Sequence, residues 1–212
     1  MTLRRTLSVA CLSALGMALM TVPAQAAPGD AVADGNAGSV TIGQTAIAPI
    51  AACSSEGPLD ASVPNTSVPN VVTYSDSKST CTIDDVGEIA TVNVSGGRFR
   101  FDALLQYGGP RIRLASYTAK CETTLTGAGS SFTFSGLSGV RVPSQIPSNY
   151  VVTVPGGPDG KPKATVTFNE SVIPNPPDGS MTVHLMHIRL FPQGGPASGD
   201  AYVGSVHCSP VS

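Results

Sequence analysis

Glycine and proline recur along the whole chain, and their spacing leaves no room for long helices. The sequence has 23 glycines and 18 prolines in 212 residues, and both residue types interrupt helices. Between them, Val, Thr, Ile and Tyr gather in short runs, which is the composition of β-strands. We therefore predict an all-β fold, an antiparallel β-sandwich of about ten short strands, with a closed barrel as the alternative.

Neighbouring runs in the middle of the chain show the strand pattern. "GEIATVNVS" and "RFRFDALLQY" flank Gly96-Gly97, a dipeptide that favours a tight turn, so we expect a β-hairpin there. In the second run apolar residues alternate with charged ones, which is typical of a strand with one buried face. Farther on, the apolar alternation of "PRIRLASYTAKCETTLTG" changes phase, and we predict a bulge or bend near Ala115.

Residues 1–26 have the layout of a secretory signal. Arg4 and Arg5 form a basic start, an apolar run extends from Leu7 to about Met20, and the run ends in a small-residue cleavage site, Ala24-Gln25-Ala26. The apolar run is too short for a membrane-spanning helix, which needs roughly 20 residues. We expect cleavage at the end of this segment and a secreted chain, free or held at the cell surface, with no membrane span.

The segment after the signal differs in composition from the rest. Residues 27–39 are small and polar, and we expect them to be weakly ordered. Residues 39–53 alternate enough to form one or two strands, and residues 54–70 are a Pro- and Ser-rich connection. The predicted organisation is an N-terminal arm, strand and loop over residues 27–70, followed by a β-sandwich domain over residues 71–212.

Four cysteines remain when the signal, which contains Cys11, is removed. An even number in an exported chain predicts two disulfides, and spacing alone allows three pairings. No CxxC motif is present, which argues against a zinc knuckle. We favour the pairs Cys53–Cys81 and Cys121–Cys208, the first closing a local loop and the second tying a middle strand to the last.

The charge balance bears on the partners. The chain has 12 basic and 14 acidic residues, and the signal holds two arginines and no acid, so the mature charge is 12 − 2 − 14 = −4. Phosphate backbones are bound by basic faces, so we expect no nucleic-acid partner.

One predicted strand carries two of the three histidines. On a regular strand, positions i and i+3 point to opposite faces, so we expect that His184 and His187 do not bind one ion together. A polar site would need His187 and His207 from neighbouring strands with a carboxylate such as Asp200 or Glu170, and zinc would need three or four such ligands. We favour a partly buried His187 with hydrogen-bonded ring nitrogens, and we expect no metal and no cofactor.

Other catalytic patterns are weak. Asp84, Asp85 and Glu88 form the densest acidic cluster, and paired carboxylates can hydrolyse glycosides or hold calcium. We favour a solvated turn, where Asp bonds to the local backbone. "GLSG" at 136–139 is one residue short of a nucleophile elbow. We therefore predict no catalytic residues.

Arginines cluster on two further strands. If "RFRF" and "RIRL" pair, their arginines come together on one sheet face near two tyrosines, a combination that suits an anionic cell-wall polymer. The alternative, which we prefer, is an ordinary polar face with Asp102 as a counter-charge. The residues of this predicted ligand face are Arg98, Arg100, Arg111, Arg113, Tyr107 and Tyr117.

The C-terminal half carries four motifs in a fixed order. They are "AKCETTLTGAGSSFTFSGLSGVRV", "ATVTFNES", "MTVHLMHIRL" and "GDAYVGSVHC". In this order, over about Val94 to Cys208, they resemble the choice-of-anchor P family, whose members are mainly actinobacterial surface or secreted proteins. His187 and Cys208 fit motif positions of the family, whereas His184 stands where the family commonly has Asn. The resemblance implies a β-rich exported domain and no known catalytic activity.

Together these features predict an exported, non-enzymatic β-sandwich. We expect it to act as a structural or interaction module at the cell surface or outside the cell, with a cell-envelope polymer or a surface protein as its partner. One alternative is a module that binds cell-wall polymer or carbohydrate. A less favoured one is a metal-dependent hydrolase that uses the polar site of His187, His207 and Asp200.

Overall fold

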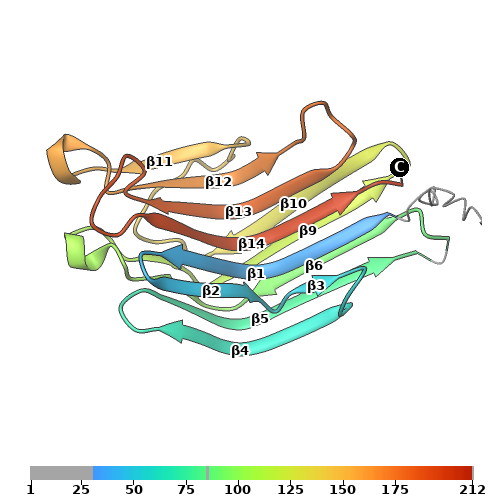
Figure 1. Cartoon of the computed structure of the whole chain (residues 1–212), viewed down its shortest axis with the longest axis horizontal. Helices are drawn as coiled ribbons and strands as arrows, with labels where there is room; N and C mark the ends of the chain where they lie inside the picture. The colour runs from blue at the N-terminus through green and yellow to red at the C-terminus, as the bar shows by residue number, and fades with distance from the viewer. Residues whose placement is uncertain (1–30, 85, 212) are drawn as a thin grey trace, which may run out of the picture.

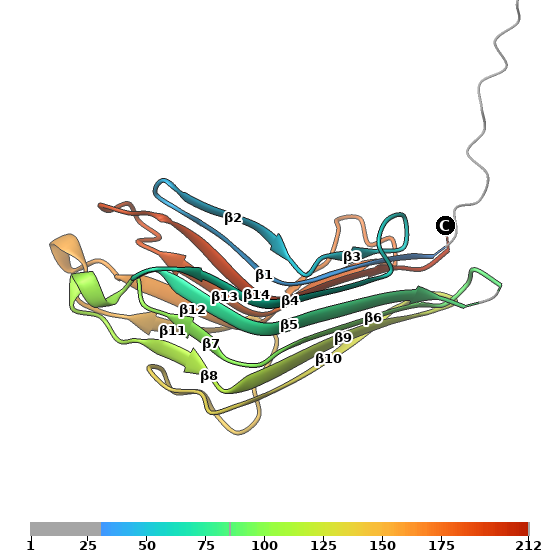
Figure 2. The same cartoon turned by 90° about the horizontal axis from the view of Figure 1, so that it is seen from below.

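The protein is built from two antiparallel β-sheets that pack face to face (Figure 1, Figure 2). The computed structural model describes residues 31–84 and 86–211, and the predicted signal lies outside these residues. Each sheet has seven strands, which makes 14 over the described residues. The predicted all-β sandwich is confirmed, and the sheets do not close into a barrel because each keeps free edge strands.

Sheet A contains both ends of the described chain. Its strand order is β11 (Tyr150–Val154), β12 (Ala164–Val172), β13 (Met181–Leu190), β14 (Gly199–Ser209), β1 (Val32–Ile42) and β2 (Thr45–Ile50), with β3 (Cys53–Ser54) also paired to β1. Sheet B comes from the middle of the chain. Its order is β10 (Gly127–Ser135), β9 (Ser116–Thr124), β6 (Ala90–Gly96), β5 (Val72–Ile83), β7 (Phe99–Phe101) and β8 (Ile112–Leu114), with β4 (Asp60–Val68) also paired to β5.

Helical structure is confined to two short 3-10 turns within these residues. They are η1 (Leu105–Tyr107) and η2 (Pro158–Gly160). In the described part of the chain, no helix has the length and apolarity needed to cross a membrane.

Residues 31–70 belong to the sandwich, contrary to the predicted arm and loop. β1 lies between β14 and β2 inside sheet A and pairs with β14 along its length (Figure 1). Residues 60–68 of the Pro- and Ser-rich segment form β4 and pair with β5. Small residues suit β1 because the sheets lie close together there. A Cβ on Gly35 would come within 2.5 Å of Val92 Cγ1 on the opposite sheet.

Both sheets bend near their middle, as Figure 2 shows. In sheet A the pairing ladders skip one continuous row of residues across four strands. The row contains Asn169, Leu185, Gly204 and Ala37. Asn169 and Gly204 have positive φ angles of 52° and 61°, which Asn and Gly adopt more readily than other residues. The alternation of buried and exposed side chains changes phase at this row.

The bend of sheet B divides two long strands into pieces. β6 and β7 both pair with β5 in one register and are separated at Gly97, so the predicted hairpin at Gly96-Gly97 is wrong. Gly96 serves packing instead, because a Cβ there would overlap the Tyr117 ring. β8 and β9 are separated at Ala115, so the predicted bend near this residue is confirmed. These breaks, with the N-terminal strands, raise the strand count above ten.

The bend also separates two hydrophobic cores. One core is rich in aromatic and large aliphatic side chains, including Tyr74, Phe99, Phe101, Phe168 and Leu190. The other is built mainly from alanine and valine together with all four disulfide cysteines. The two ends of the sandwich are therefore filled by different means, large side chains at one and covalent bonds between closely spaced sheets at the other.

Both disulfides join sheet A to sheet B. Cys53 of β3 is bonded to Cys81 of β5, with their Cα atoms 5.6 Å apart, and Cys121 of β9 is bonded to Cys208 of β14. The predicted pairing is confirmed. Because the loops they close span 28 and 87 residues, the chain-entropy model gives stabilisations of about 3.5 and about 4.5 kcal/mol.

Two buried tyrosines cross the sandwich at the bend. The Tyr74 hydroxyl donates a hydrogen bond to the carbonyl oxygen of Tyr202 (2.7 Å), and the Tyr117 hydroxyl donates one to that of Ala37 (2.9 Å). Burial raises the pKa of both phenols, so both remain protonated donors. Each bond satisfies a backbone acceptor of sheet A, and the Ala37 acceptor lies in the row where the ladders of this sheet are interrupted.

Candidate binding surfaces on the outer sheet faces

The outer face of sheet A brings His184 and His187 together, contrary to the prediction that they point to opposite faces. Their ring centroids are 6.5 Å apart. The reason is the bend. The consecutive residues Leu185 and Met186 are both buried, so the alternation of inward and outward side chains along β13 shifts by one residue. The rule for regular strands therefore fails between these two histidines.

His187 lies between two carboxylates. Its Nδ1 is 2.9 Å from Glu170 of β12, and its Nε2 is 2.7 Å from Asp200 of β14. Ionised carboxylates only accept hydrogen bonds, so when Glu170 and Asp200 are both ionised these contacts fit a ring with protons on both nitrogens, an imidazolium. The residue is 4 % exposed, so it is more deeply buried than the predicted partly buried His187, and both ring nitrogens are hydrogen-bonded as predicted.

The electrostatics of this cluster are balanced. Burial of the imidazole opposes its charged form, but the bonds to Glu170 and Asp200 outweigh burial and raise the pKa of His187. Burial would raise the pKa values of the two carboxyl groups, yet His187 lowers both, and Arg189 Nε, 3.0 Å from Asp200, contributes. Two positive and two negative groups thus form a neutral network across three strands.

Tyr202 covers the histidine pair. Its ring stacks on His187 with a centroid distance of 4.2 Å and an interplanar angle of 20°, and it lies 4.6 Å from the His184 ring. An imidazolium against an aromatic face is a cation–π contact. The sequence reasoning missed Tyr202, although the outward alternation of Asp200 and Tyr202 in β14 was the available signal.

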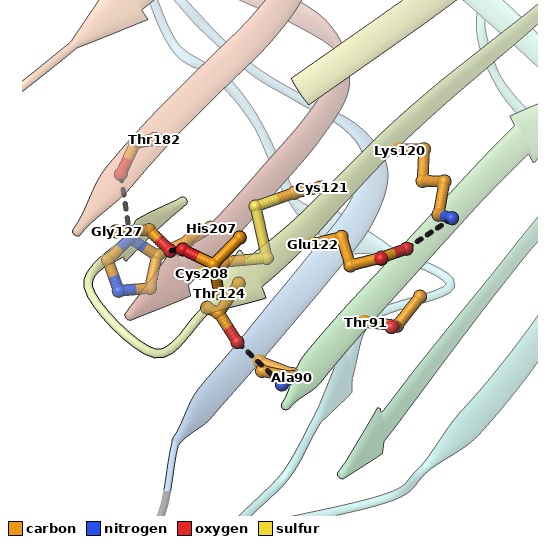
Figure 3. Close-up of a disulfide and its surroundings, with 12 residues drawn as sticks. Ala90, Thr91, Lys120, Cys121, Glu122, Thr124, Gly127, Thr182, His207 and Cys208 are labelled. Atoms are coloured by element: carbon orange, nitrogen blue, oxygen red, sulfur yellow. Dashed lines mark hydrogen bonds and ion pairs between the residues drawn. A yellow bond between two sulfur atoms is a disulfide. The ribbon is translucent and has the colours of Figure 1, made fainter. Parts of the chain in front are cut away.

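A shallow depression of about 350 Å³ adjoins this cluster on sheet A. His184 Nδ1 is 2.8 Å from Ser205 Oγ, and His207 Nδ1 is 2.9 Å from Thr182 Oγ1. Both pairs are direct cross-strand neighbours, so the sheet register accounts for each bond. Figure 3 shows His207 with Thr182 beside the Cys121–Cys208 disulfide. The lining residues are Asp34, Gly35, Asn36, Ser39, Thr182, His184, Tyr202, Ser205, Val206 and His207.

The predicted polar site is assembled only in part. His187 and Asp200 are in contact, and Glu170 joins them, but His207 bonds to a threonine instead. Among the residues that the structure describes, no group of three or more His, Cys, Asp or Glu side chains is arranged to hold a metal ion. Within this cluster the acid–base capacity of His187 is occupied by its two carboxylate partners.

The predicted ligand face on sheet B contains its arginines but not its tyrosines. Tyr117 is 1 % exposed inside the sandwich, so its assignment to this face is wrong. The phase change at Ala115 turns its side chain inward. Tyr107 is half-buried and packs edge-on against Phe191, with a centroid distance of 4.8 Å. The tyrosines therefore support the core and the end of the sandwich.

The arginines lie around the bend of sheet B. Arg100 of β7 is directly opposite Arg113 of β8, and Asp102, 7 % exposed, contacts both Arg100 (2.8 Å) and Arg111. The predicted counter-charge role of Asp102 is confirmed for these two residues. Three arginines line an open depression of about 360 Å³ with neighbouring apolar residues. Its lining is Arg98, Arg100, Arg113, Leu114, Ala115 and Gly136.

The remaining sequence candidates have local roles. Asp84 accepts hydrogen bonds from the backbone N–H groups of Glu88 (2.7 Å) and Ile89 (3.0 Å), as expected for a polar turn. Asp85 lies outside the described residues. Ser138 of "GLSG" exchanges two backbone hydrogen bonds with Arg113, so this segment is an extension of the sheet and not a nucleophile elbow.

Comparison with known proteins gave no match to a family model, a curated protein or a solved structure.

Proposed function

We propose that this protein is an exported, non-enzymatic β-sandwich that acts as an interaction module at the cell surface or outside the cell. The observation that carries the proposal is that both disulfides are bonds between the two sheets. Such bonds persist in oxidising compartments and are rare where thiols are kept reduced. The secretory layout of residues 1–26 and the resemblance to choice-of-anchor P proteins support the same proposal.

A binding role fits the outer faces better than catalysis does. His187 uses both ring nitrogens for Glu170 and Asp200, which removes it as a free general base. His184 contacts the Ser205 hydroxyl, but an activated serine needs a base that is itself oriented by a third group. These side chains instead stabilise the sheet surface.

The second candidate, a module that binds cell-wall polymer, is favoured by one observation. Three arginines line one depression on sheet B, while Asp102 contacts only Arg100 among them. Guanidinium groups bind anionic oxygens through paired hydrogen bonds. The partner class that this surface supports is an anionic polymer of the envelope.

Fractionation of expressing cells tests the exported module. The full chain and a chain starting at Ala27 are expressed in a bacterial host, and medium, envelope and cytoplasm are analysed separately. We expect the full chain in the medium or envelope, cut after Ala26 and with both disulfides oxidised in non-reducing peptide mapping. The shorter chain should stay inside the cell. Retention of the full chain in the cytoplasm with free thiols would contradict the proposal.

A further inference from the structure

We infer that the depression lined by Arg98, Arg100 and Arg113 is a binding site for phosphate groups, and that its ligand is a phosphate-bearing polymer such as one built from polyol phosphate units. The inference deepens the proposed interaction module and rests on it for the polymeric source of the phosphate.

The bend creates the depression. Arg98 stands where β6 breaks into β7, and Ala115 stands where β8 breaks into β9. The segment after β10 passes close to this point. A Cβ added at Gly136, which has a φ of 62°, would lie only 2.6 Å from the Cβ of Ala115. The small residues Ala115 and Gly136 therefore line the depression together with the longer side chains of the three arginines.

Two of the three arginines, Arg98 and Arg113, are not held by an acidic side chain among the described residues. Arg100 and Arg113 are directly opposite each other on adjacent strands, and like charges in that relationship destabilise a sheet. Among the side chains that the structure describes, no carboxylate lies within 4.0 Å of Arg98 or Arg113. An anionic ligand would reduce the repulsion between Arg100 and Arg113. Because Arg98 and Arg113 have no carboxylate partner among the described residues, their charges favour an external partner.

Arg100 is positioned in advance. Its Nε lies 2.8 Å from Asp102 without hydrogen-bond alignment, and one terminal nitrogen donates to Thr73 Oγ1 at 3.3 Å. Asp102 is held in turn by Arg111. A guanidinium whose direction is fixed loses less conformational entropy when a ligand binds.

The donor set favours phosphate over carboxylate. A planar carboxylate is satisfied by one arginine fork, whereas a tetrahedral phosphate accepts hydrogen bonds in several directions. Three guanidinium groups gathered around one depression supply donors for such a group. A repeating polymer adds affinity because neighbouring phosphates raise the effective concentration at the site.

The test measures binding by the oxidised, purified protein, whichever compartment it is recovered from. Titrations use inorganic phosphate, poly(glycerol phosphate), polygalacturonate and neutral dextran, followed by calorimetry and by amide chemical shifts. We expect poly(glycerol phosphate) to bind, inorganic phosphate to bind more weakly at the same residues, and dextran not to bind. In the R98Q/R113Q double variant, affinity for poly(glycerol phosphate) should fall about tenfold or more, and the salt dependence should become shallower.

A matched control removes the same charge from the same sheet. K78Q/K120Q neutralises two lysines that line a different depression on the other side of the bend, and it should change affinity less than about twofold. R98K/R113K keeps the positive charges but loses the paired N–H donors of the guanidinium groups. We expect its affinity for poly(glycerol phosphate) to lie between those of the natural protein and R98Q/R113Q. Equal losses in the two glutamine variants, equal binding of polygalacturonate, or no binding of any anion would overturn the phosphate site. None of these results depends on whether the chain is exported, which the fractionation decides.

Discussion

Tyr117 of sheet B donates a hydrogen bond across the sandwich to the carbonyl oxygen of Ala37 in sheet A, at 2.9 Å. Ala37 lies in the row where the ladder between β1 and β14 is interrupted, so the phenol replaces a lost strand contact. In a straight sheet this carbonyl would accept a hydrogen bond from the backbone of the neighbouring strand. The bend therefore depends on Tyr117 to satisfy the carbonyl that it leaves without a backbone partner.

Removing this hydroxyl should lower stability. In Tyr117→Phe the Ala37 carbonyl loses its partner inside the protein, and we expect the free energy of unfolding to fall by about 1–3 kcal/mol. Urea denaturation of oxidised protein measures the change. Tyr150→Phe, on the edge strand β11, is the matched control and should shift stability by less than about 0.5 kcal/mol. A similar loss in both variants would argue against a special role for the Tyr117 bond.

Gly96 should not tolerate a side chain. A Cβ at this position would overlap the Tyr117 ring, and relief requires movement of a buried side chain. We expect Gly96→Ala to destabilise the protein by about 1–3 kcal/mol, the usual cost of overpacking. Gly127→Ala is the control, since a Cβ added at Gly127 would have no atom within 4 Å and the φ there is not positive. Equal unfolding midpoints for the two variants would be inconsistent with the described packing.

The Glu170–His187–Asp200 cluster should make stability depend on pH. The folded-state pKa of His187 is raised above 6.5, so its contribution is complete below that pH and is lost as the pH rises through the folded value. Glu170 and Asp200 have pKa values lowered from 4.5 and 3.8, so their contributions are lost as the pH falls through the folded values. The cluster therefore stabilises most between about pH 4.5 and 6.5.

His187→Gln should reduce this pH dependence. Unfolding free energies measured from pH 5 to pH 9 are expected to decline above about pH 6.5 in the natural protein and to decline less in the variant. His207→Gln serves as the control, because His207 bonds to the Thr182 hydroxyl and to no carboxylate among the described residues. An unchanged pH profile in His187→Gln would show that the cluster does not hold a proton in the way its geometry indicates.

The two disulfides should contribute unequally. Cys121–Cys208 closes a span of 87 residues and Cys53–Cys81 one of 28, so the chain-entropy model predicts a larger loss, by about 1 kcal/mol, when the longer loop is opened. Paired Cys→Ser variants compared by urea denaturation measure the difference. A greater loss from opening the shorter loop would contradict a dominant effect on the unfolded chain.

The sequence was most informative where side-chain chemistry repeats. The strand class and the bend at Ala115 follow from composition and from a phase change in the apolar alternation. The even number of cysteines predicts two disulfides, but the pairing found is one of three that the spacing allows. The same phase change is present around Leu185 and Met186, where two apolar residues follow one another. The regular-strand rule takes no account of it and therefore places the two histidines of sheet A on opposite faces.

Other features could not be predicted, because they depend on the distance between the two sheets. The sequence of one strand does not show how closely a second sheet packs against it. Gly35 and the alanines of β1 suggested a weakly ordered arm, but small residues are what a closely packed pair of sheets requires. Gly96-Gly97 has the composition of a turn, yet Gly96 makes room for the ring of Tyr117. Likewise, the side chain of Tyr117 points inward because the strand bends at Ala115. Tyr117 is therefore buried and does not belong to the predicted ligand face.

Because both disulfides lie on the alanine- and valine-rich side of the bend, the two halves of the molecule should fail under different perturbations. Reductant acts on the end whose small side chains provide little cohesion of their own. Truncation of a buried Phe acts on the opposite end, which has no covalent tie between its layers within the described chain. One polypeptide thus combines a redox-sensitive end with a redox-indifferent one, and the boundary between them is where the arginines gather.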